Sequence, residues 1–235
     1  YRIPVEDRKA LTEEMIKAQP MDGVVLLGGC DKTVPAQLMG ALSADKPTIC
    51  LVAGPMVTGD YQGEKLGACT DCRRFWREYR AGHVDDEQIE LINNQLCSST
   101  GTCMVMGTAS TMAALAEAMG MMLPGGAAIP AVMAERRRQA EATGRAVVAA
   151  IQKDLRPSRV LSKRSFENAI RVLMAIGGST NAIIHLTAIA KRIGIQLTLT
   201  DFNRIGDQTP VLVNLKPSGK YYMEDLAKSG GIPTV

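Results

Sequence analysis

Two short apolar runs, separated by a glycine turn and a helical pattern, constrain the fold of this chain more than any other feature. Residues 21–27 and 47–52 have the length and continuous apolar character of buried strands, and a helix opened by Pro35 is expected between them, ending near residue 44. Strand, turn, helix and strand in this order predict a βαβ unit with parallel strands. Ligands of such units collect at the carboxyl ends of the strands, so the turn at residues 28–33 is the first candidate site.

The remainder of the chain is predicted to be mainly helical. The apolar strands and the excess of helices indicate an α/β fold class, with a mainly parallel sheet covered by helices. Residues 54–70 are rich in glycine and polar residues without periodicity, and we expect a long loop there. A strand is expected at 211–215, and helices are expected at 6–19, 72–79, 85–96, 102–122, 131–154, 165–176, from the turn at 177–181 to residue 192, at 201–205 and at 222–228.

The composition excludes several classes of protein. Hydrophobic residues make up 46% of the 235, which is ample for a core, while a net charge of +3 with 4% aromatic residues indicates no nucleic-acid surface. No apolar run approaches the roughly 20 residues of a membrane span. Six cysteines are too few and too unevenly spaced for a disulfide framework. We therefore expect a soluble, cytoplasmic protein whose reduced cysteines are free for metal binding or catalysis.

Cys30 and Cys103 are the cysteines best placed for chemistry. Cys30 lies in the glycine turn after the first strand, and Cys103 lies at the expected start of the helix at 102–122, capped by the hydroxyl-rich residues before it. A backbone can approach a cluster closely at such turns, and thiolates there suit iron, zinc or nucleophilic roles. The alternative is that each cysteine is a small buried hydrophobe.

Asp31 and Lys32, directly after Cys30, strengthen the functional interpretation. A carboxylate and an amine beside a thiol on a tight turn concentrate polar groups at a strand end. Asp31 could instead cap the following helix, and Lys32 could be solvated. The histidines indicate less, since His83 falls in a polar loop and His185 in an apolar helix, where a core histidine is favoured over a catalyst.

The other cysteines carry weaker signals. Cys69 and Cys72 form a single C-x-x-C with no second pair, which is weak evidence for a zinc or redox site. Cys50 falls in a strand and is expected in the core. We expect Cys97 to lie near the turn of Cys103 without binding metal.

Six motifs in this order resemble those of the dihydroxy-acid and sugar-acid dehydratases. The form at residues 102–110 is more similar to the aldonate branch, which acts on arabinonate, xylonate and similar acids, than to the branched-chain amino-acid enzyme. The motifs span nearly the whole chain and are Gly29-Cys30-Asp31-Lys32-Thr33, Ala53-Gly54-Pro55-Met56, Gly101-Thr102-Cys103-Met104-Val105-Met106-Gly107-Thr108-Ala109-Ser110-Thr111-Met112, Leu123-Pro124-Gly125, Gly177-Gly178-Ser179-Thr180-Asn181 and Leu215-Lys216-Pro217-Ser218-Gly219.

The resemblance implies two cofactors. The family holds a cluster, [2Fe–2S] in the aldonate enzymes, with three cysteines, and Cys30 and Cys103 match the second and third. It also binds Mg²⁺ nearby: Asp31 matches one ligand, and Lys32 matches a lysine carbamylated by carbon dioxide. The modification fits the chemistry, because an ammonium cannot bind a cation whereas a carbamate offers anionic oxygens.

The implied reaction dehydrates a sugar acid to a 2-keto-3-deoxy acid. Proton removal beside the carboxylate leaves an enolate-like charge, and stabilising that charge should be the largest catalytic term. Ser179 and Thr180 are candidates for substrate contact because of their glycine turn. The resemblance also implies that residues 1–235 are an incomplete N-terminal cluster-binding domain, without the first cysteine, further metal ligands and the serine general base, and that the full-length protein is a homodimer or homotetramer.

Two further interpretations stay open. The first is another member of the same family, acting on branched dihydroxy acids or on phosphogluconate. The second is a non-catalytic binding or assembly fragment. The resemblance further implies that these residues alone are inactive, because two of three thiolates would not hold a cluster tightly.

Overall fold

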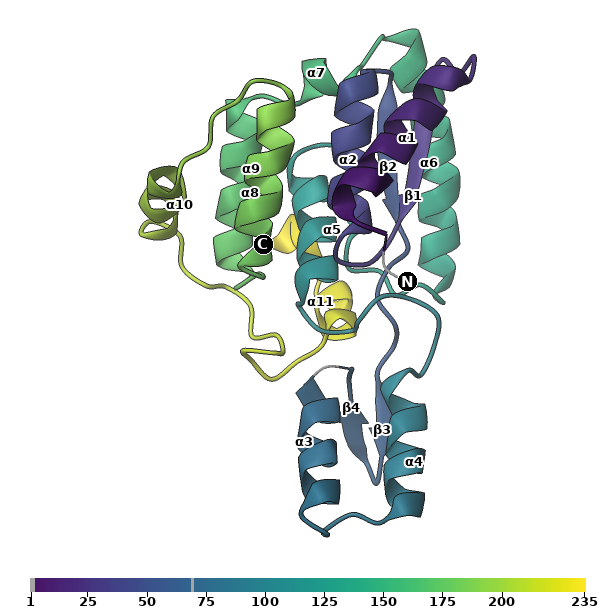
Figure 1. The fold of residues 1–235 in the computed structure, drawn as a ribbon, viewed down its shortest axis with the longest axis vertical. Coiled ribbons are helices and arrows are strands. Elements are labelled where there is room, and N and C mark those ends of the chain that lie inside the picture. Colours follow the sequence, from purple (N-terminus) through teal and green to yellow (C-terminus); the bar gives the residue numbers. More distant parts are fainter. Residues whose placement is uncertain (1–2, 69) are drawn as a thin grey trace.

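A computed structural model describes residues 3–68 and 70–235 of the chain (Figure 1). Helices surround a small parallel sheet, and a second, smaller group of elements extends from one end (Figure 1). In chain order the elements are α1 Val5–Ala18, β1 Val24–Gly28, α2 Thr33–Ala44, β2 Thr48–Val52, β3 Gly59–Tyr61, β4 Glu64–Leu66, α3 Thr70–Arg80, α4 Asp86–Leu96, α5 Thr108–Ala118, α6 Ala134–Gln152, α7 Pro157–Val160, α8 Lys163–Ala175, α9 Asn181–Arg192, α10 Leu199–Gly206, α11 Met223–Lys228 and the 3₁₀ turn η1 Ile232–Thr234.

The predicted βαβ unit is present. β1 and β2 pair in parallel, from Val24 opposite Thr48 to Gly28 opposite Val52, and α2 connects them. The backbone of Cys50 also forms a parallel bridge to Met122, on the other side of β2. The sheet is therefore parallel and covered by helices, as the α/β prediction requires, but it is small.

The core is largely helical. Most of α2 and nearly all of α5 are buried, because their sequences are apolar or small on every face and lack the polar stripe of a surface helix. α1 packs on α2, α6 covers both strands, and α2, α5 and α9 contact one another. Since α2 follows directly on the carboxyl end of β1, this packing also gathers the starts of α5 and α9 near that end (Figure 1).

The expected long loop at 54–70 contains a hairpin instead. β3 and β4 pair antiparallel around Gln62 and Gly63, and both of these residues have positive φ, as a two-residue hairpin turn of this twist requires. With α3 and α4 the hairpin forms the small lobe at the bottom of Figure 1. The lobe has its own cluster of buried side chains, which are Leu66, Phe75, Ile89, Ile92 and Leu96.

Two other predicted elements also differ. The helix predicted at 102–122 spans only Thr108–Ala118, because Thr102 pairs with Pro55, the chain then bends through residues 104–107, and the methionines after the helix return to the sheet. The strand predicted at 211–215 is not formed: these residues are irregular chain, Val211 and Leu212 are exposed, and among them only Leu215 forms a bridge, with Tyr221. Within the described residues, no helix combines the length and the apolar character that crossing a membrane demands.

Candidate active site at the carboxyl end of the sheet

The turn that follows β1 presents Cys30 at the protein surface. Its backbone has a φ of 71°, a left-handed conformation that costs a non-glycine residue roughly 1–2 kcal/mol. Such conformations persist where the surrounding structure enforces them, often at functional sites. The thiol is exposed, and its Sγ lies 3.4 Å from Oδ1 of Asp31. The backbone thus holds this side chain out from the end of the strand.

The segment that carries Cys103 lies against the same turn. A Cβ built on Gly29 would lie 3.1 Å from Cγ2 of Thr102, so the residues directly before the two cysteines are in contact. The Thr102 N–H donates to the Gly54 carbonyl at 2.9 Å, which ties this segment to the chain leaving β2. The two cysteines are 73 residues apart in the sequence, but the backbone segments directly before them touch at the carboxyl end of the sheet.

Gly101 allows the second segment to approach this closely. Its φ is +135°, and a Cβ there would lie 2.6 Å from the backbone nitrogen of Met56. That distance is well inside van der Waals contact and the atom belongs to the backbone, so no rotamer change could relieve it. Only glycine fits both the conformation and the space at this position.

The expected helix start at Cys103 is wrong. Thr102 forms a parallel bridge with Pro55, the Met106 N–H donates to the Lys216 carbonyl at 2.7 Å, and α5 begins only at Thr108. Backbone pairing with the segment after β2 therefore overrides the hydroxyl caps that suggested an earlier start. Cys103 is partly buried and packs beside Met104 and Tyr222. It lies on the irregular chain between the bridge at Thr102 and the start of α5, and not at a helix N-terminus.

Asp31 and Lys32 form an ion pair next to Cys30. The Lys32 ammonium lies 2.9 Å from Oδ2 of Asp31, and both side chains are partly exposed. Asp31 does not cap α2, whose first turn has no side-chain cap. Across residues 3–68 and 70–235, no three His, Cys, Asp or Glu side chains come together in a way that could hold a metal ion.

The glycine turn before α9 is linked to the start of α5. The Ser179 hydroxyl lies 2.8 Å from Oγ1 of Thr108, which also accepts a hydrogen bond from the Asn181 amide at 3.1 Å. The Ser179 N–H donates to Oγ1 of Thr111 at 3.0 Å. Ser179 thus joins two helix starts, whereas Thr180 is exposed. Of this pair, Thr180 has the hydroxyl that is more accessible to a substrate.

His185 lies closer to this site than the sequence suggested. It is half-buried on α9 and lines a groove, and its pKa is lowered by burial and by the charge of Lys32, while Asp31 acts in the opposite direction. The imidazole is therefore within electrostatic reach of the polar turn after β1. A helical pattern alone could not reveal this, because the packing of α9 on α2 creates the proximity.

Three other cysteines lie within the described residues, namely Cys50, Cys72 and Cys97. Cys50 is in the core, as predicted, and burial raises the pKa of its thiol to about 12. Cys72 packs against the core of the small lobe, and Cys97 is exposed at the end of α4. Cys69 lies outside the described residues, so the C-x-x-C hypothesis stays a prediction.

A buried polar cluster behind Cys103 was missed by the sequence analysis. The Lys216 ammonium lies 3.0 and 3.1 Å from the two carboxylate oxygens of Asp71 and 2.7 Å from the Tyr222 hydroxyl. Burial alone would raise the pKa of Asp71, but hydrogen bonds from the Gly67 N–H, Lys216 and Tyr222 outweigh it and lower the pKa. The cluster fastens α3 of the small lobe to the segment that pairs with Met106.

A second buried pair supports the chain leaving β2. Glu117 accepts hydrogen bonds from the Gly125 and Ala127 N–H groups, at 2.6 and 2.8 Å, and burial raises its pKa. Arg136 is also buried, which lowers its pKa to about 10, and it packs so tightly on Gly54 that a Cβ there would lie 2.6 Å from Nη2. These contacts fix the position of Gly54, whose carbonyl accepts the hydrogen bond from the Thr102 N–H.

Several known proteins are similar in sequence to this chain over nearly its whole length. The sequence profile described as dihydroxy-acid/6-phosphogluconate dehydratase N-terminal matches residues 8–235. L-arabinonate dehydratase of Rhizobium leguminosarum bv. trifolii is 51% identical over 95% of this chain and 38% of its own length. 6-deoxy-6-sulfo-D-gluconate dehydratase of Pseudomonas putida is 47% identical over 94% and 38%, and dihydroxy-acid dehydratase of Thermodesulfovibrio yellowstonii is 44% identical over 100% and 43%. The chain thus spans about two fifths of the length of these relatives.

Proposed function

Because the chain belongs to the dihydroxy-acid/6-phosphogluconate dehydratase family, we propose that it is the cluster-binding N-terminal part of a hydro-lyase that dehydrates a sugar acid to a 2-keto-3-deoxy acid. The main structural support for this proposal is the contact between the turn of Cys30 and the segment of Cys103. The second candidate is dehydration of a branched dihydroxy acid, which is favoured by the relative of that name that matches the whole chain.

The donors fit two ligands of an iron–sulfur cluster. Cys30 is exposed, Cys103 is partly accessible, and Gly29 lets the segment of Cys103 approach the turn of Cys30 closely. We assign both thiolates to a [2Fe–2S] cluster and expect a third from a part of the full-length protein outside residues 1–235. With three cysteine ligands, such a cluster leaves one iron able to act as a Lewis acid on a departing hydroxyl.

Asp31 and Lys32 fit a site for Mg²⁺. In its ammonium form Lys32 pairs with the Asp31 carboxylate at 2.9 Å, and we expect this positive charge to disfavour a metal cation there. Carbamylation removes that positive charge and adds oxygen donors, so that the same two side chains can bind Mg²⁺ together. In this arrangement they bind and orient the carboxylate end of the substrate beside the two thiols.

The neighbouring helices position this end of the site. Ser179, Thr108 and Asn181 lock the start of α9, which follows the exposed Thr180, to the start of α5. His185 of α9 is within electrostatic reach of Asp31 and Lys32. Thr180 is proposed as a hydrogen-bonding partner of a substrate hydroxyl. The group that removes the proton is assigned to the remainder of the full-length protein.

Turnover by the full-length protein tests the proposal. The protein is incubated with L-arabinonate, D-xylonate, 6-deoxy-6-sulfo-D-gluconate and 2,3-dihydroxyisovalerate after reconstitution with iron, sulfide and Mg²⁺, and 2-keto acid is measured as its semicarbazone. At least one sugar acid is expected to react faster than the branched acid. Turnover of the branched acid alone would support the second candidate, and no turnover of any acid would refute both.

A further inference from the structure

The small lobe, which consists of β3, β4, α3 and α4, is joined to the larger body close to Cys103 (Figure 1). The helices and strands of the lobe pack mainly on one another, around the lobe's own buried side chains. Its attachment therefore depends on side chains and loops at the junction. At the surface, the Lys65 ammonium lies 2.6 Å from a carboxylate oxygen of Glu224. In a more buried position, Asp71 of α3 pairs with Lys216.

The loop at residues 216–223 holds the chain that directly follows Cys103. The Met106 N–H donates to the Lys216 carbonyl at 2.7 Å. The Met104 carbonyl accepts a second hydrogen bond from the same loop, at 2.9 Å. The loop is thus bonded to the backbone one and three residues after the cysteine. Because of these two bonds, a shift of the loop displaces the segment that carries the thiol.

The lobe also forms part of the wall beside Cys103. The Ala68 N–H donates to Sδ of Met104 at 3.0 Å, and the buried ring of Tyr222 packs in the same group of side chains. A Cβ on Gly67 would lie 2.5 Å from Cε1 of Tyr222 and 3.1 Å from Cγ of Met104, so only glycine permits this close approach. The lobe therefore contacts the side chain next to the cysteine as well as the loop behind it.

A buried ion pair keeps the lobe and the loop together. The Lys216 ammonium lies 3.0 and 3.1 Å from the two carboxylate oxygens of Asp71, and it also donates to the Tyr222 hydroxyl at 2.7 Å. The Tyr222 hydroxyl in turn lies 2.8 Å from Oδ2 of Asp71. The side chain of Asp71 is 4% exposed and that of Lys216 is 18% exposed. Separating the lobe from the loop would leave these charges without partners in a largely apolar environment, which is costly.

We propose that the small lobe acts as a clamp on one ligand of the iron–sulfur cluster, and that Lys216 is the positioning residue of this clamp. Through Asp71, Lys216 fixes the loop at residues 216–223, and through the loop it fixes the thiol of Cys103. This inference rests on the proposed function, which assigns the Cys103 thiolate to the cluster. Groups that orient metal ligands without binding the metal determine how tightly it is held. Cys30 is held by the turn after β1 and does not depend on the clamp.

The test measures how fast the reconstituted full-length protein releases iron to excess EDTA, followed by the loss of visible absorption. The wild type is compared with Asp71→Asn and Lys216→Met, which break the ion pair, and with Lys216→Arg, which can still pair with the carboxylate. Release is expected to be roughly ten- to hundred-fold faster in the first two variants. Lys216→Arg should remain closer to the wild type. Tyr222→Phe removes only a hydroxyl, so it is the mildest change, and it should also release iron faster than the wild type.

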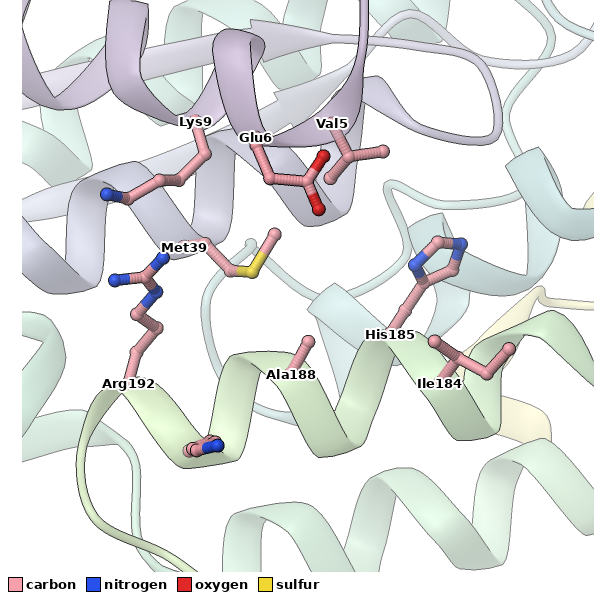
Figure 2. A pocket seen from close by; sticks show the side chains of 9 residues that line it. Val5, Glu6, Lys9, Met39, Ile184, His185, Ala188 and Arg192 are labelled. Atoms are coloured by element: carbon pink, nitrogen blue, oxygen red, sulfur yellow. The ribbon is translucent and has the colours of Figure 1, made fainter.

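Two controls separate positioning from loss of stability or of charge. Ile205→Ala removes a buried side chain of α10, which packs on α8, and lowers stability without touching the clamp. Arg192→Gln removes an exposed cation that lines the groove between α1 and α9 (Figure 2). Both controls should release iron at the wild-type rate, at a temperature where circular dichroism shows every variant folded.

Alkylation of cluster-free full-length protein by iodoacetamide, resolved by mass spectrometry, supplies a second readout. Cys103 should react faster in Asp71→Asn than in the wild type, because its surroundings open more often, whereas Cys30 should be unchanged. The inference is overturned by wild-type release rates in Asp71→Asn, Lys216→Met and Tyr222→Phe, or by equally fast release in Ile205→Ala. A wild-type protein that binds no iron would refute the proposed function itself, and the alkylation rates would still test the clamp.

Discussion

The buried cluster of Asp71, Lys216 and Tyr222 gives the most quantitative prediction for stability. In Asp71→Asn the amide can still accept a hydrogen bond from the Gly67 N–H, but the Lys216 ammonium, which lies 3.0 and 3.1 Å from the two carboxylate oxygens, loses its counter-ion. Asp71 itself is 3% exposed. Removing one partner of a buried ion pair costs about 3–5 kcal/mol. Because acceptors remain, we expect the lower end, about 3 kcal/mol, or a fall of roughly 6–12 °C in Tm for a chain of this size.

Urea unfolding of the 235-residue chain measures this loss. Trp76 is its single tryptophan and lies on α3, in the lobe that Asp71 fastens, so its fluorescence reports on the affected region. Glu64→Gln is the matched control, because it removes the partner of Arg74 from an exposed ion pair of 2.6 Å, which should cost less than about 1 kcal/mol. A loss in Asp71→Asn no greater than that of the control would refute the importance of the cluster.

The pH dependence provides an independent check. The folded-state pKa of Asp71 is lowered, so its ionised form stabilises the fold above the unfolded-state pKa, near 4, and this contribution is lost as pH falls through the folded-state pKa. The stability difference between wild type and Asp71→Asn should be full at pH 7 and shrink below about pH 4. A difference that stays constant down to pH 3 would contradict the assigned ionisation.

Three other changes test particular contacts, and a fourth, Gly194→Ala, is the control for the first. Gly101→Ala should destabilise the chain by about 3 kcal/mol in urea unfolding, because it combines a positive φ with a 2.6 Å approach to the Met56 nitrogen. Gly194→Ala has a positive φ but no atom within 4 Å of the new Cβ, so it should cost only about 1 kcal/mol, and equal losses would contradict the close approach. Asp85→Ala removes the capping box of α4 and should cost about 1 kcal/mol, with no change expected if the cap is not formed. Thr108→Val breaks the bonds to Ser179 and Asn181 and should lower kcat/KM of the full-length protein roughly tenfold, whereas unchanged kinetics would exclude a positioning role.

Local sequence patterns were sufficient to predict the helices and strands that lead to the site. The strand, glycine turn and helix around Cys30 follow from apolar runs and from the position of Pro35, and the structure has them within a few residues of the predicted bounds. The cap of α8 is likewise a local feature, because Ser162 lies three residues before Ser165 and forms a capping box with it. In these cases the local preference and the tertiary environment favour the same structure.

The predictions were wrong where contacts between residues far apart in the sequence determine the structure. Thr102 pairs with the chain after β2, which delays α5 until Thr108 despite the hydroxyl-rich start before it. The hairpin of β3 and β4 has only three residues in each strand, too few for a period of two to be recognised. The ion pair of Asp71 and Lys216 joins residues that are 145 positions apart, and no sequence spacing could indicate it.

The central claim is that Cys30 and Cys103 bind one metal cluster together. The most direct measurement is the iron content and visible absorption of the full-length protein after reconstitution, compared among the wild type, Cys30→Ser, Cys103→Ser and the core control Cys50→Ser. Iron and absorption are expected in the wild type and in Cys50→Ser, and both should be lost in either of the other variants. Wild-type spectra and iron content in Cys30→Ser or Cys103→Ser would contradict it.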